Sequence, residues 1–556
     1  MTSRALILFA CAAAGVAAGG CARRETAVKA GDREQILHLG NLSEPKDLDP
    51  HTVTGVTENN ISAALLEGLV AEDPQDLHPV PGVAERWTVD DGGGRYTFHL
   101  RPDARWSNGD PVTAGDFVFA YRRMLSPGTG SPYAYMLFCL TNAQAFNQGR
   151  ISDFALVGAH AADERTLVLT LEAPVSYFLS LLNHYSWFPL HPPTILKHGR
   201  IDQIGTPWTR SGNFVGNGPF VLKAWDPNDR IVVARSDTYW DRDRVRLREI
   251  HFHAIGDHQT EERTFRAGQL HVTGTVPIDM IPVYRKQHPE LLQLAPYLGT
   301  YYYQLNVRRP PLDDARVRRA LAAAINRDQI VRYVTRAGEA PALHFTPPDA
   351  AGYTTEARLA ASPAKARQWL AEAGFPGGKG FPRLTLLFNT SDAHERIAQA
   401  IQQMWKKELG VDIELVNMEW KVYLAQTQCG QYDLARAAWI GDYVDPNSFL
   451  DMWVTDGGNN RTGWSNADYD RLIRAAARAG DPAERYRLFQ QAEALLMDQL
   501  PIIPIYFYRS KALVRPSVRG RFPNILDHHP YKHIYLDAGA PAAAPANAAA
   551  GRRSND

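Results

Sequence analysis

The strongest restriction on the fold comes from a segment in the second half of the chain, where a helix leads directly into a strand. The helical stretch 394–409 ends at Gly410, and Val411, Ile413 and Leu415 then alternate with polar residues, as in a half-buried strand. A helix followed at once by a strand is typical of an α/β lobe, in which helices cover a sheet. We therefore expect a mixed α/β fold.

Other helix and strand signals are spread along the chain. Ser362 is suited to cap a helix that starts at Pro363 and ends at Gly374. Asp481-Pro482 opens another helix in the same way, which runs to about Leu500. The period of two in hydrophobicity predicts strands at residues 95–100, 166–171 and 247–255.

The composition is that of an ordinary globular protein. The 556 residues include 60 Lys plus Arg against 60 Asp plus Glu, and 45% are hydrophobic. This balance argues against disorder and gives no electrostatic reason to expect nucleic acid as a partner. At roughly 150 residues per domain, we expect about three domains.

The catalytic motifs in the sequence are all incomplete. Residues 374–379 (GFPGGK) resemble a phosphate-binding loop, but the spacing is wrong and Gly380 stands where a Ser or Thr would ligate Mg²⁺. His394-Glu395 begins a zinc-protease-like HExxH, but Ala398 replaces the second His. A G-x-S-x-G nucleophile motif is absent as well. We therefore expect a binding protein without a cofactor, not an enzyme.

Histidines suggest one metal hypothesis. His251 and His253 alternate on a predicted strand and so share a face, and Asp257-His258 follow closely. A second group comprises His528, His529 and His533. Imidazole pairs can bind Ni²⁺, Cu²⁺ or Zn²⁺, but two ligands do not complete a site. We therefore expect solvated or hydrogen-bonded histidines and no metal.

The N-terminus has the pattern of an export signal. Arg4 precedes the uncharged, mostly apolar run Ala5–Ala18, and Gly19-Gly20-Cys21 follow. This run is shorter than the ~20 residues of a membrane span. The small residues before Cys21 resemble a bacterial lipobox, which predicts removal of the signal peptide 1–20 and a lipid on Cys21. An ordinary signal peptide with an incidental cysteine is the alternative.

The regions flanking the fold and the remaining cysteines lead to further expectations. Residues 21–33 are expected to be a lipidated tether, and the Ala/Pro-rich tail 538–556 is expected to be disordered. Cys139 and Cys429 are far apart in sequence, so we expect two thiols that do not bond to each other.

Five groups of segments resemble one known family and occur in that family's order. They are Glu44-Pro45 with LDPH (48–51) and LEGL (66–69); PGVAE (81–85) with YTFHLR (96–101) and WSNGDPVTAGDFVFAYRR (106–123); GNGPFVLKAW (216–225) with YWD (239–241); YLGTYYYQLN (297–306) with PPLDDARVRRAL (310–321) and INR (325–327); and EWKVYL (419–424) with YDLARAAWIGDYVDPNSFL (432–450). The family is that of the peptide-binding receptors of ABC importers, the bacterial extracellular solute-binding proteins of family 5. The resemblance covers almost all of residues 36–537.

This resemblance implies a two-lobed periplasmic-binding-protein fold that closes on its ligand like a flytrap. It is the large type with an additional subdomain, so that there are three lobes in all. Lobe I would comprise residues 34–67, 194–297 and 510–537, residues 68–193 the accessory subdomain, and residues 298–509 the opposing lobe. The chain would therefore cross a hinge twice.

The resemblance also assigns a ligand site. In this family a short peptide lies extended between the lobes and is held mainly by main-chain hydrogen bonds. Asp442 stands where the family has the carboxylate that meets the ligand's α-ammonium group, and a turn-capping Asp is the alternative. Arg436 matches an arginine that can face the ligand's carboxylate, with a surface ion pair as the alternative. The aromatic residues that match positions near the ligand, each with burial in the core as its alternative, are Trp420, Trp439, Tyr133, Tyr297 and Tyr302.

The chain departs from the family pattern at several positions around the ligand. A close relative has an acidic residue at the position of Thr54. It has an Arg-His pair at those of Thr427 and Gln428. The cysteines of its disulfide fall at Gly299 and Ile440. Because charged pocket walls are replaced by neutral ones, the resemblance implies a preference for peptides with neutral or apolar side chains.

The implied function is that of a monomeric lipoprotein in the periplasm or at the cell surface. It would capture short peptides and deliver them to the permease and ATPase subunits of an ABC importer, and its lipid would hold it at a membrane. The alternatives are a receptor of the same fold for a dipeptide, a murein peptide, nickel or a sugar, or a signalling receptor. A surface peptidase is disfavoured, because no nucleophile and base motif is present.

Overall fold

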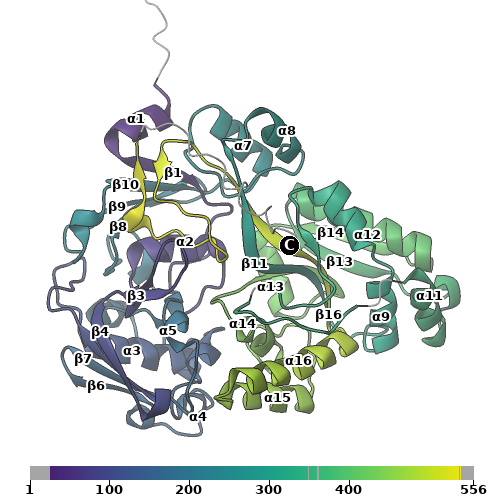
Figure 1. The fold of residues 1–556 in the computed structure, drawn as a ribbon, viewed down its shortest axis with the longest axis horizontal. Coiled ribbons are helices and arrows are strands. Elements are labelled where there is room, and N and C mark those ends of the chain that lie inside the picture. The colour runs from purple at the N-terminus through teal and green to yellow at the C-terminus, as the bar shows by residue number, and fades with distance from the viewer. Residues whose placement is uncertain (1–24, 349, 360–361, 538, 540–556) are drawn as a thin grey trace, which may run out of the picture.

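The computed structural model describes residues 25–348, 350–359, 362–537 and 539. Three large sheets with helices packed against them form the molecule, which confirms the predicted mixed α/β class (Figure 1). The predicted signal peptide 1–20, the lipidation site Cys21 and nearly all of the predicted tail 538–556 lie outside the described residues.

The first sheet combines the N-terminal strand with three strands from the middle of the chain. Strand β1 is parallel to β10, and the other neighbours are antiparallel. The order is β1 (Ile36–Gly40), β10 (Glu249–His253), β9 (Arg230–Arg235) and β8 (Phe220–Asp226), so the strand predicted at 247–255 is present. The helices of this region are α1 (Ala27–Glu34), α2 (Val56–Leu65), α7 (His258–Arg266) and α8 (Ile281–Gln287).

Helix α1 shows that the predicted tether 21–33 is too long. The side chain of Thr26 caps this helix by accepting a hydrogen bond from the backbone N–H of Lys29. At the other end of α1, the Gln35 amide donates to the carbonyl oxygen of Leu536 at 2.7 Å. The folded part therefore starts near residue 26, because the C-terminal segment of the fold supplies a partner that the local sequence does not reveal.

The second sheet is formed by one continuous stretch of chain and is entirely antiparallel. Its order is β4 (Ala84–Asp90), β5 (Arg95–Leu100), β7 (Thr166–Thr170) and β6 (Ala159–Asp163), which confirms the strands predicted at 95–100 and 166–171. A short hairpin of β2 (Val70–Glu72) and β3 (Pro79–Pro81) precedes it. The helices here are α3 (Ala114–Leu125), α4 (Ala143–Asn147), α5 (Phe178–Leu181) and α6 (Pro192–His198).

The third sheet has six strands and carries the longest helices. Its order is β12 (Ala340–Pro341), β16 (Ile502–Leu513), β11 (Leu292–Leu305), β15 (Leu434–Ile440), β13 (Leu384–Asn389) and β14 (Ile413–Met418). The accompanying helices are α9 (Ala315–Ala323), α10 (Arg327–Gln329), α11 (Pro363–Glu372), α12 (Asp392–Leu409), α13 (Trp420–Gln428), α14 (Asn447–Leu450), α15 (Ala467–Arg478) and α16 (Pro482–Gln499).

The local signals of this third region are all present in the structure. Ser362 and Asp481 cap α11 and α16 through their side chains, as predicted. Gly410 ends α12 in the left-handed conformation with φ 71°, and its N–H bonds to the carbonyl oxygen of Lys406 at 3.1 Å. The helix and strand predicted over residues 394–415 are therefore α12 and β14.

Strands β11 and β16 form the long antiparallel pair in the middle of the molecule (Figure 1). Their register shifts between Pro296 and Thr300, so the ladder is interrupted there. After β16, the chain returns to the first region, where β17 (Val518–Arg519) pairs with β18 (Tyr535–Leu536). Strands β11 and β16 thus connect the first and third regions.

Candidate functional site

Asp442 lies directly after β15 in a backbone held from both sides. The N–H of Gly441 donates to the carbonyl oxygen of Leu298 at 2.7 Å, and a Cβ at Gly441 would come within 2.8 Å of the Leu298 side chain. A larger residue at this position would have to displace the side chains of Leu298 and Phe449. The N–H of Asp442 donates to the hydroxyl of Ser448 at 2.8 Å. The carboxylate therefore projects from a rigid strand end.

The carboxylate of Asp442 is nearly buried, and no Lys or Arg of the described residues forms an ion pair with it, although the charge of His528 acts to lower its pKa. Its side chain is 11% exposed. One oxygen accepts a hydrogen bond from the Tyr133 hydroxyl at 3.3 Å and lies 3.5 Å from Nε2 of His184. The other oxygen, Oδ2, is buried and has no hydrogen-bond partner. Burial raises the pKa of Asp442 to about 8, because the charged form loses its hydration.

His184 does not supply the missing positive charge. Burial lowers the pKa of its imidazole to about 3, so the ring is neutral near pH 7. The N–H of Ser186 donates to Nδ1 at 3.3 Å, which leaves the proton of the neutral ring on Nε2, the nitrogen that faces Asp442. The pocket around Asp442 thus offers two neutral donors and a carboxylate, an arrangement suited to a cationic group from outside the chain.

Aromatic side chains enclose this carboxylate. The Tyr133 ring lies between those of Tyr185 and Trp439, with centroid distances of 5.9 and 6.5 Å. Tyr133 is 3% exposed and Trp439 is 9% exposed. The Trp439 indole N–H donates to the carbonyl oxygen of Ser448 at 2.5 Å, which fixes the ring. The structure therefore brings three of the predicted site residues together: Asp442, Trp439 and Tyr133.

Arg436 lies on the opposite face of β15. It pairs in register with Tyr303, whereas Trp439 pairs with Thr300, and an odd separation along a strand places side chains on opposite faces. The guanidinium donates to the Tyr508 hydroxyl at 2.8 Å and to the Asn389 side chain at 3.3 Å. Among the described residues, no carboxylate forms an ion pair with Arg436. This is a half-buried cation with neutral partners only.

His394 stands beside this arginine, although sequence analysis considered it only as part of an incomplete HExxH. Its ring lies 5.6 Å from that of Tyr301, and the Arg436 guanidinium lies 5.0 Å from the same ring. Nδ1 of His394 is buried without a hydrogen-bond partner. Burial, and then the charges of Arg436, His258 and Lys511, hold the pKa of His394 well below its usual value. No spacing in the sequence indicates this cluster of Tyr301, His394 and Arg436, because its members come from three separate elements, β11, α12 and β15.

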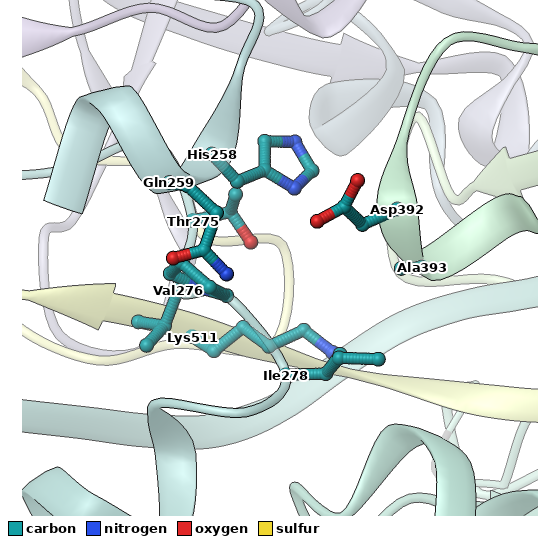
Figure 2. A pocket seen from close by; sticks show the side chains of 9 residues that line it. His258, Gln259, Thr275, Val276, Ile278, Asp392, Ala393 and Lys511 are labelled. Carbon is teal, nitrogen blue, oxygen red and sulfur yellow. The ribbon is translucent and has the colours of Figure 1, made fainter. Parts of the chain in front are cut away.

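A hollow of about 360 Å³ lies between α7, the start of α12 and β16; its lining residues are drawn in Figure 2. It is lined by His258 of α7, by residues 275–278, by Asp392 at the start of α12 and by Lys511 of β16. The ammonium group of Lys511 pairs with Glu339 at 2.7 Å. None of the residues predicted from the sequence to contact a ligand lines this hollow.

A second hollow, of about 310 Å³, joins three predicted residues from distant segments. Thr54 of the loop before α2 meets Trp420 and Gln428 of α13 there, and Lys46 and Glu58 complete the charged part of the wall. The Glu58 carboxylate accepts from the backbone N–H of Lys46 at 2.8 Å, so its charge is partly satisfied locally.

Thr427 and Tyr302 lie elsewhere. Thr427 is fully buried, and its hydroxyl donates to the carbonyl oxygen of Tyr423 at 3.0 Å within α13. Tyr302 is 3% exposed and packs edge-to-face on Phe345 and Trp453, with centroid distances of 5.3 and 5.8 Å. Their contacts are those of core residues, because a β-strand or helix turns successive side chains to different faces.

Tyr297, the pair Gly299 and Ile440, and the two cysteines are the remaining positions singled out from the sequence. Tyr297 is half-buried, with its ring 6.2 Å from that of Tyr508, the residue that accepts from Arg436. Gly299 and Ile440 are opposite each other in the β11–β15 ladder, and the Ile440 side chain fills the space next to Gly299. Cys139 and Cys429 are free thiols, which confirms that they do not bond to each other.

The edge of β15 between the two unpaired charges is open. Within the described part of the chain, β13 pairs with β15 only at Leu434 and Ala435. From Arg436 to Ile440, that side of β15 has no strand partner, although the Arg436 carbonyl oxygen accepts a hydrogen bond from the Tyr423 hydroxyl, and β11 pairs with the other side throughout. An open strand edge can accept an added strand through main-chain hydrogen bonds.

Solved structures identify the class of protein that has this fold and site. The murein tripeptide-binding protein of Escherichia coli superposes with a TM-score of 0.86 and 35% identity, over 90% of this chain and 98% of that one. The oligopeptide-binding protein of Haemophilus influenzae in complex with the peptide RPPGFSPFR gives 0.85 and 33%, over 90% and 99%. The fold is thus that of the multi-domain α/β substrate-binding proteins.

The family follows from the sequence comparisons. The model of the bacterial extracellular solute-binding proteins, family 5, matches residues 78–461. The periplasmic oligopeptide-binding protein of Escherichia coli (strain K12) is 39% identical over 498 residues, which cover 88% of this chain and 90% of that protein. The chain belongs to the bacterial extracellular solute-binding proteins of family 5. Its relatives named here are binding proteins, not enzymes.

The relative arrangement of the regions matches one of two forms of a single relative. The unliganded open form of the murein tripeptide-binding protein gives a TM-score of only 0.64, compared with 0.86 for the other structure of the same protein. The present structure therefore differs from the open arrangement. In the part of the chain that the structure describes, no helix combines the length and apolar character of a membrane span.

Proposed function

We propose that this protein captures short peptides in extended form between its lobes and delivers them to the permease and ATPase of an ABC importer. The membership in family 5 and the relatives named for oligopeptide and murein tripeptide binding support this function. The physical support is the site itself. It has an unpaired carboxylate, an unpaired guanidinium and, between them along β15, an open strand edge.

The observation that carries this proposal is the buried Oδ2 of Asp442, which has no partner. A peptide's α-ammonium group placed there would pair with the carboxylate and stabilise its ionised form, which burial disfavours in the empty site. The peptide backbone would add to the open edge of β15, which recognises no particular side chain. The carboxylate of a short peptide would face Arg436, where the neutral partners leave the guanidinium charge available.

Isothermal titration calorimetry with tri-alanine and its N-acetylated form tests the proposal. Because the empty site holds Asp442 with a pKa of about 8, the carboxyl group is mostly protonated at pH 7. An ammonium group lowers this pKa, so binding should release close to one proton per peptide. Titrations in two buffers of different ionisation enthalpy measure that proton. Binding of both peptides with equal affinity and no proton release would show that the amino group is not recognised at Asp442.

Two further parts of the proposal concern the lobes and the membrane. The division into lobe I (34–67, 194–297 and 510–537), the accessory subdomain (68–193) and the opposing lobe (298–509) is supported by the sheets, each of which lies mainly within one part. The interrupted ladder between Pro296 and Thr300 is suited to act as the hinge. The monomer would be held at a membrane by a lipid on Cys21, which mass spectrometry of the mature protein tests.

The wall around Thr54 and Gln428 supports a preference for neutral or apolar peptide side chains. Both residues are uncharged, and the nearby Glu58 already has local hydrogen bonds. Tripeptides that differ only in the middle residue should therefore bind more tightly with Ala or Leu than with Lys or Asp. Equal affinity across such a series would contradict this preference.

A further inference from the structure

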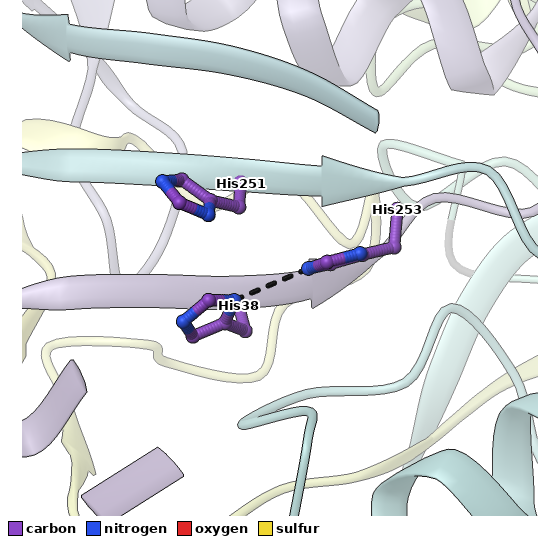
Figure 3. A group of neighbouring side chains, drawn as sticks. All are labelled: His38, His251 and His253. Carbon is purple, nitrogen blue, oxygen red and sulfur yellow. Dashed lines mark hydrogen bonds between the residues drawn. The ribbon is translucent and has the colours of Figure 1, made fainter. Parts of the chain in front are cut away.

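Three histidines from two distant segments meet on one face of the first sheet. His38 of β1 and His251 of β10 are opposite each other in a parallel ladder, and His253 lies two residues further along β10 (Figure 3). Residues two apart on a strand share a face, so all three imidazoles are on the same side. Sequence analysis identified only the pair His251 and His253, because His38 is 215 residues away from His253.

The spacing of the ring nitrogens suits a metal ion. Nδ1 of His38 and Nε2 of His253 are 3.2 Å apart, and one nitrogen from each of the three rings lies within 4.8 Å of the others. Two nitrogens bound tetrahedrally to one ion at about 2.0–2.1 Å would be about 3.3–3.4 Å apart. The first pair already has about this separation, as a hydrogen bond between the two rings, and the His251 nitrogen would have to move closer to complete the site.

His251 is oriented as a metal ligand would be. Its Nε2 lies 2.8 Å from the Glu249 carboxylate, which holds the ring and takes the proton-bearing nitrogen. Its other nitrogen, Nδ1, is buried and has no hydrogen-bond partner. A carboxylate behind a histidine fixes the tautomer and makes the free nitrogen a better donor to a metal. No described group of the protein forms a hydrogen bond with Nδ1 of His251, so this nitrogen is free to bind a ligand.

The surroundings keep His38 and His253 neutral. Burial, followed by repulsion from neighbouring imidazoles, lowers the pKa of His38 to about 3 and that of His253 to about 4. Arg230 of β9, opposite His253 in the ladder, is the nearby cation, and the carboxylates of Asp226 and Asp229 lie 4.0 and 3.8 Å from it. Neutral imidazole is the form that binds metals.

A fourth histidine, His271, holds the backbone of the strand that carries His38. His271 is fully buried, and its Nδ1 accepts the backbone N–H of His38 at 3.0 Å. Its Nε2 lies 3.3 Å from the carboxylate of Asp32. Because its Nδ1 accepts from the backbone of β1 and its Nε2 faces Asp32, His271 holds β1 in place and is not counted among the ligands.

We propose that His38, His251 and His253 form a binding site for a divalent cation of borderline softness, with Zn²⁺ as the reference ion. Three neutral imidazoles suit Zn²⁺, Ni²⁺, Cu²⁺ or Co²⁺ and leave a fourth position for water or an outside ligand. This site shares no residue with the peptide site, and it does not depend on peptide binding.

Calorimetric titration of the full chain, made without a histidine tag and treated with a chelator, with Zn²⁺ at pH 7.5 tests this proposal. One ion should bind per chain, and replacement of Zn²⁺ by Co²⁺ should give the visible absorption of a low-symmetry site. His253→Gln and His251→Gln should each lower the Zn²⁺ affinity at least ~100-fold, and Glu249→Gln by ~10–100-fold. The exposed His160 offers a matched control, since His160→Gln should leave the affinity unchanged.

The unfolding temperature of each metal-free variant separates loss of a ligand from loss of the fold. The metal-free forms should unfold near the wild-type temperature. Zn²⁺ at 100 times the wild-type Kd should raise the unfolding temperatures of wild type and His160→Gln by about 2–3 °C, and those of His251→Gln and His253→Gln by less than about 0.5 °C. No binding of Zn²⁺ or Co²⁺ by the folded wild type would overturn the proposal. Unchanged affinity in both ligand variants would do so as well, because it would place the ion elsewhere.

Discussion

Asp442 and Asp445 are buried aspartates only three residues apart, yet their surroundings differ completely. Arg485 donates to both oxygens of Asp445, at 2.5 and 2.9 Å, and the N–H of Asn447 donates to it at 2.8 Å. The carboxylate of Asp442 has one tyrosine hydroxyl, one neutral imidazole and an oxygen without a partner. Asp445 thus has an arginine partner within the chain, which Asp442 lacks.

The two arginines of the same region repeat this contrast. The guanidinium of Arg485 forms an ion pair with Asp445. Among the described residues, the side chain of Arg436 has only a tyrosine and an asparagine as hydrogen-bond partners. Burial is therefore not what distinguishes the candidate site from the rest of the core. A buried charge that the chain leaves uncompensated points to a group supplied from outside, and a compensated one points to structure.

The largest effect is expected from breaking the compensated pair. Asp445→Asn leaves Arg485 buried without its carboxylate, which should lower the free energy of unfolding by about 3–5 kcal/mol. Denaturant unfolding followed by tryptophan fluorescence measures this. If Asp445→Asn and Asp442→Asn change stability equally at pH 5, the contrast between structural and uncompensated carboxylates is wrong.

Removal of the uncompensated charge should instead affect ligand binding. Asp442→Asn should weaken tripeptide binding by about 2–5 kcal/mol, because the α-ammonium group would be buried without a counter-charge. The same calorimetric titration as for wild type measures the loss. The N-acetylated tripeptide is the control, since its already weak binding should hardly change. A loss of less than tenfold would place the amino anchor at another residue.

The pH dependence of stability should differ between wild type and Asp442→Asn. The folded state raises the Asp442 pKa to about 8, above its unfolded value, so between about pH 4 and 8 the folded chain holds a proton that the unfolded chain has lost. Rising pH therefore destabilises the wild type through this group by about 1.4 kcal/mol per unit. Asp442→Asn lacks this loss and should gain about 2.7 kcal/mol relative to wild type between pH 5 and 7.

Unfolding midpoints of both proteins at pH 5, 6 and 7 test this difference. The titratable groups around Asp442 are Tyr133, His184, Asp451 and His528, and all of them are retained in the variant. The charge of Asp442 helps to raise the pKa values of Asp451 and His528, so the pH-dependent difference between the two proteins measures this coupled group, with Asp442 as its centre. A difference that is constant with pH would show that the Asp442 pKa is not raised in the folded state.

The smallest effect concerns the other unpaired charge. Arg436→Gln should weaken binding of a free tripeptide by about 1.5–3 kcal/mol, the range of a hydrogen bond to a charged group. A C-terminally amidated tripeptide should bind wild type and variant almost equally. Equal loss for both peptides would show that Arg436 supports the strand and does not face the ligand carboxylate.

Sequence analysis was most successful where the signal is local. The caps Ser362 and Asp481 and the glycine stop at Gly410 each act on backbone groups a few residues away, so their elements are found where expected. The predicted tether failed at α1 for the opposite reason. Gln35 is held by Leu536, 501 residues away in sequence.

The candidate site was predictable only in part. Resemblance to family 5 singled out Asp442, Trp439 and Tyr133, which lie together, and Thr427 and Tyr302, whose contacts are those of core residues. It did not single out His394. A motif match identifies a position but does not say which face of a strand or helix the side chain occupies, and that face is set by pairing with other elements.

The amino-acid sequence by itself determined the α/β class, the boundaries of those elements that have local caps or a clear hydrophobic period, and the residue types available for recognising a peptide. The tertiary structure alone decided which charges remain unpaired. Tyr133 and Asp442 are separated by 309 residues, and His38 and His253 by 215. Propensities, caps and hydrophobic periods act over a few residues, whereas the energy of a buried charge or an imidazole cluster depends on whatever the folded chain brings within a few ångströms of it.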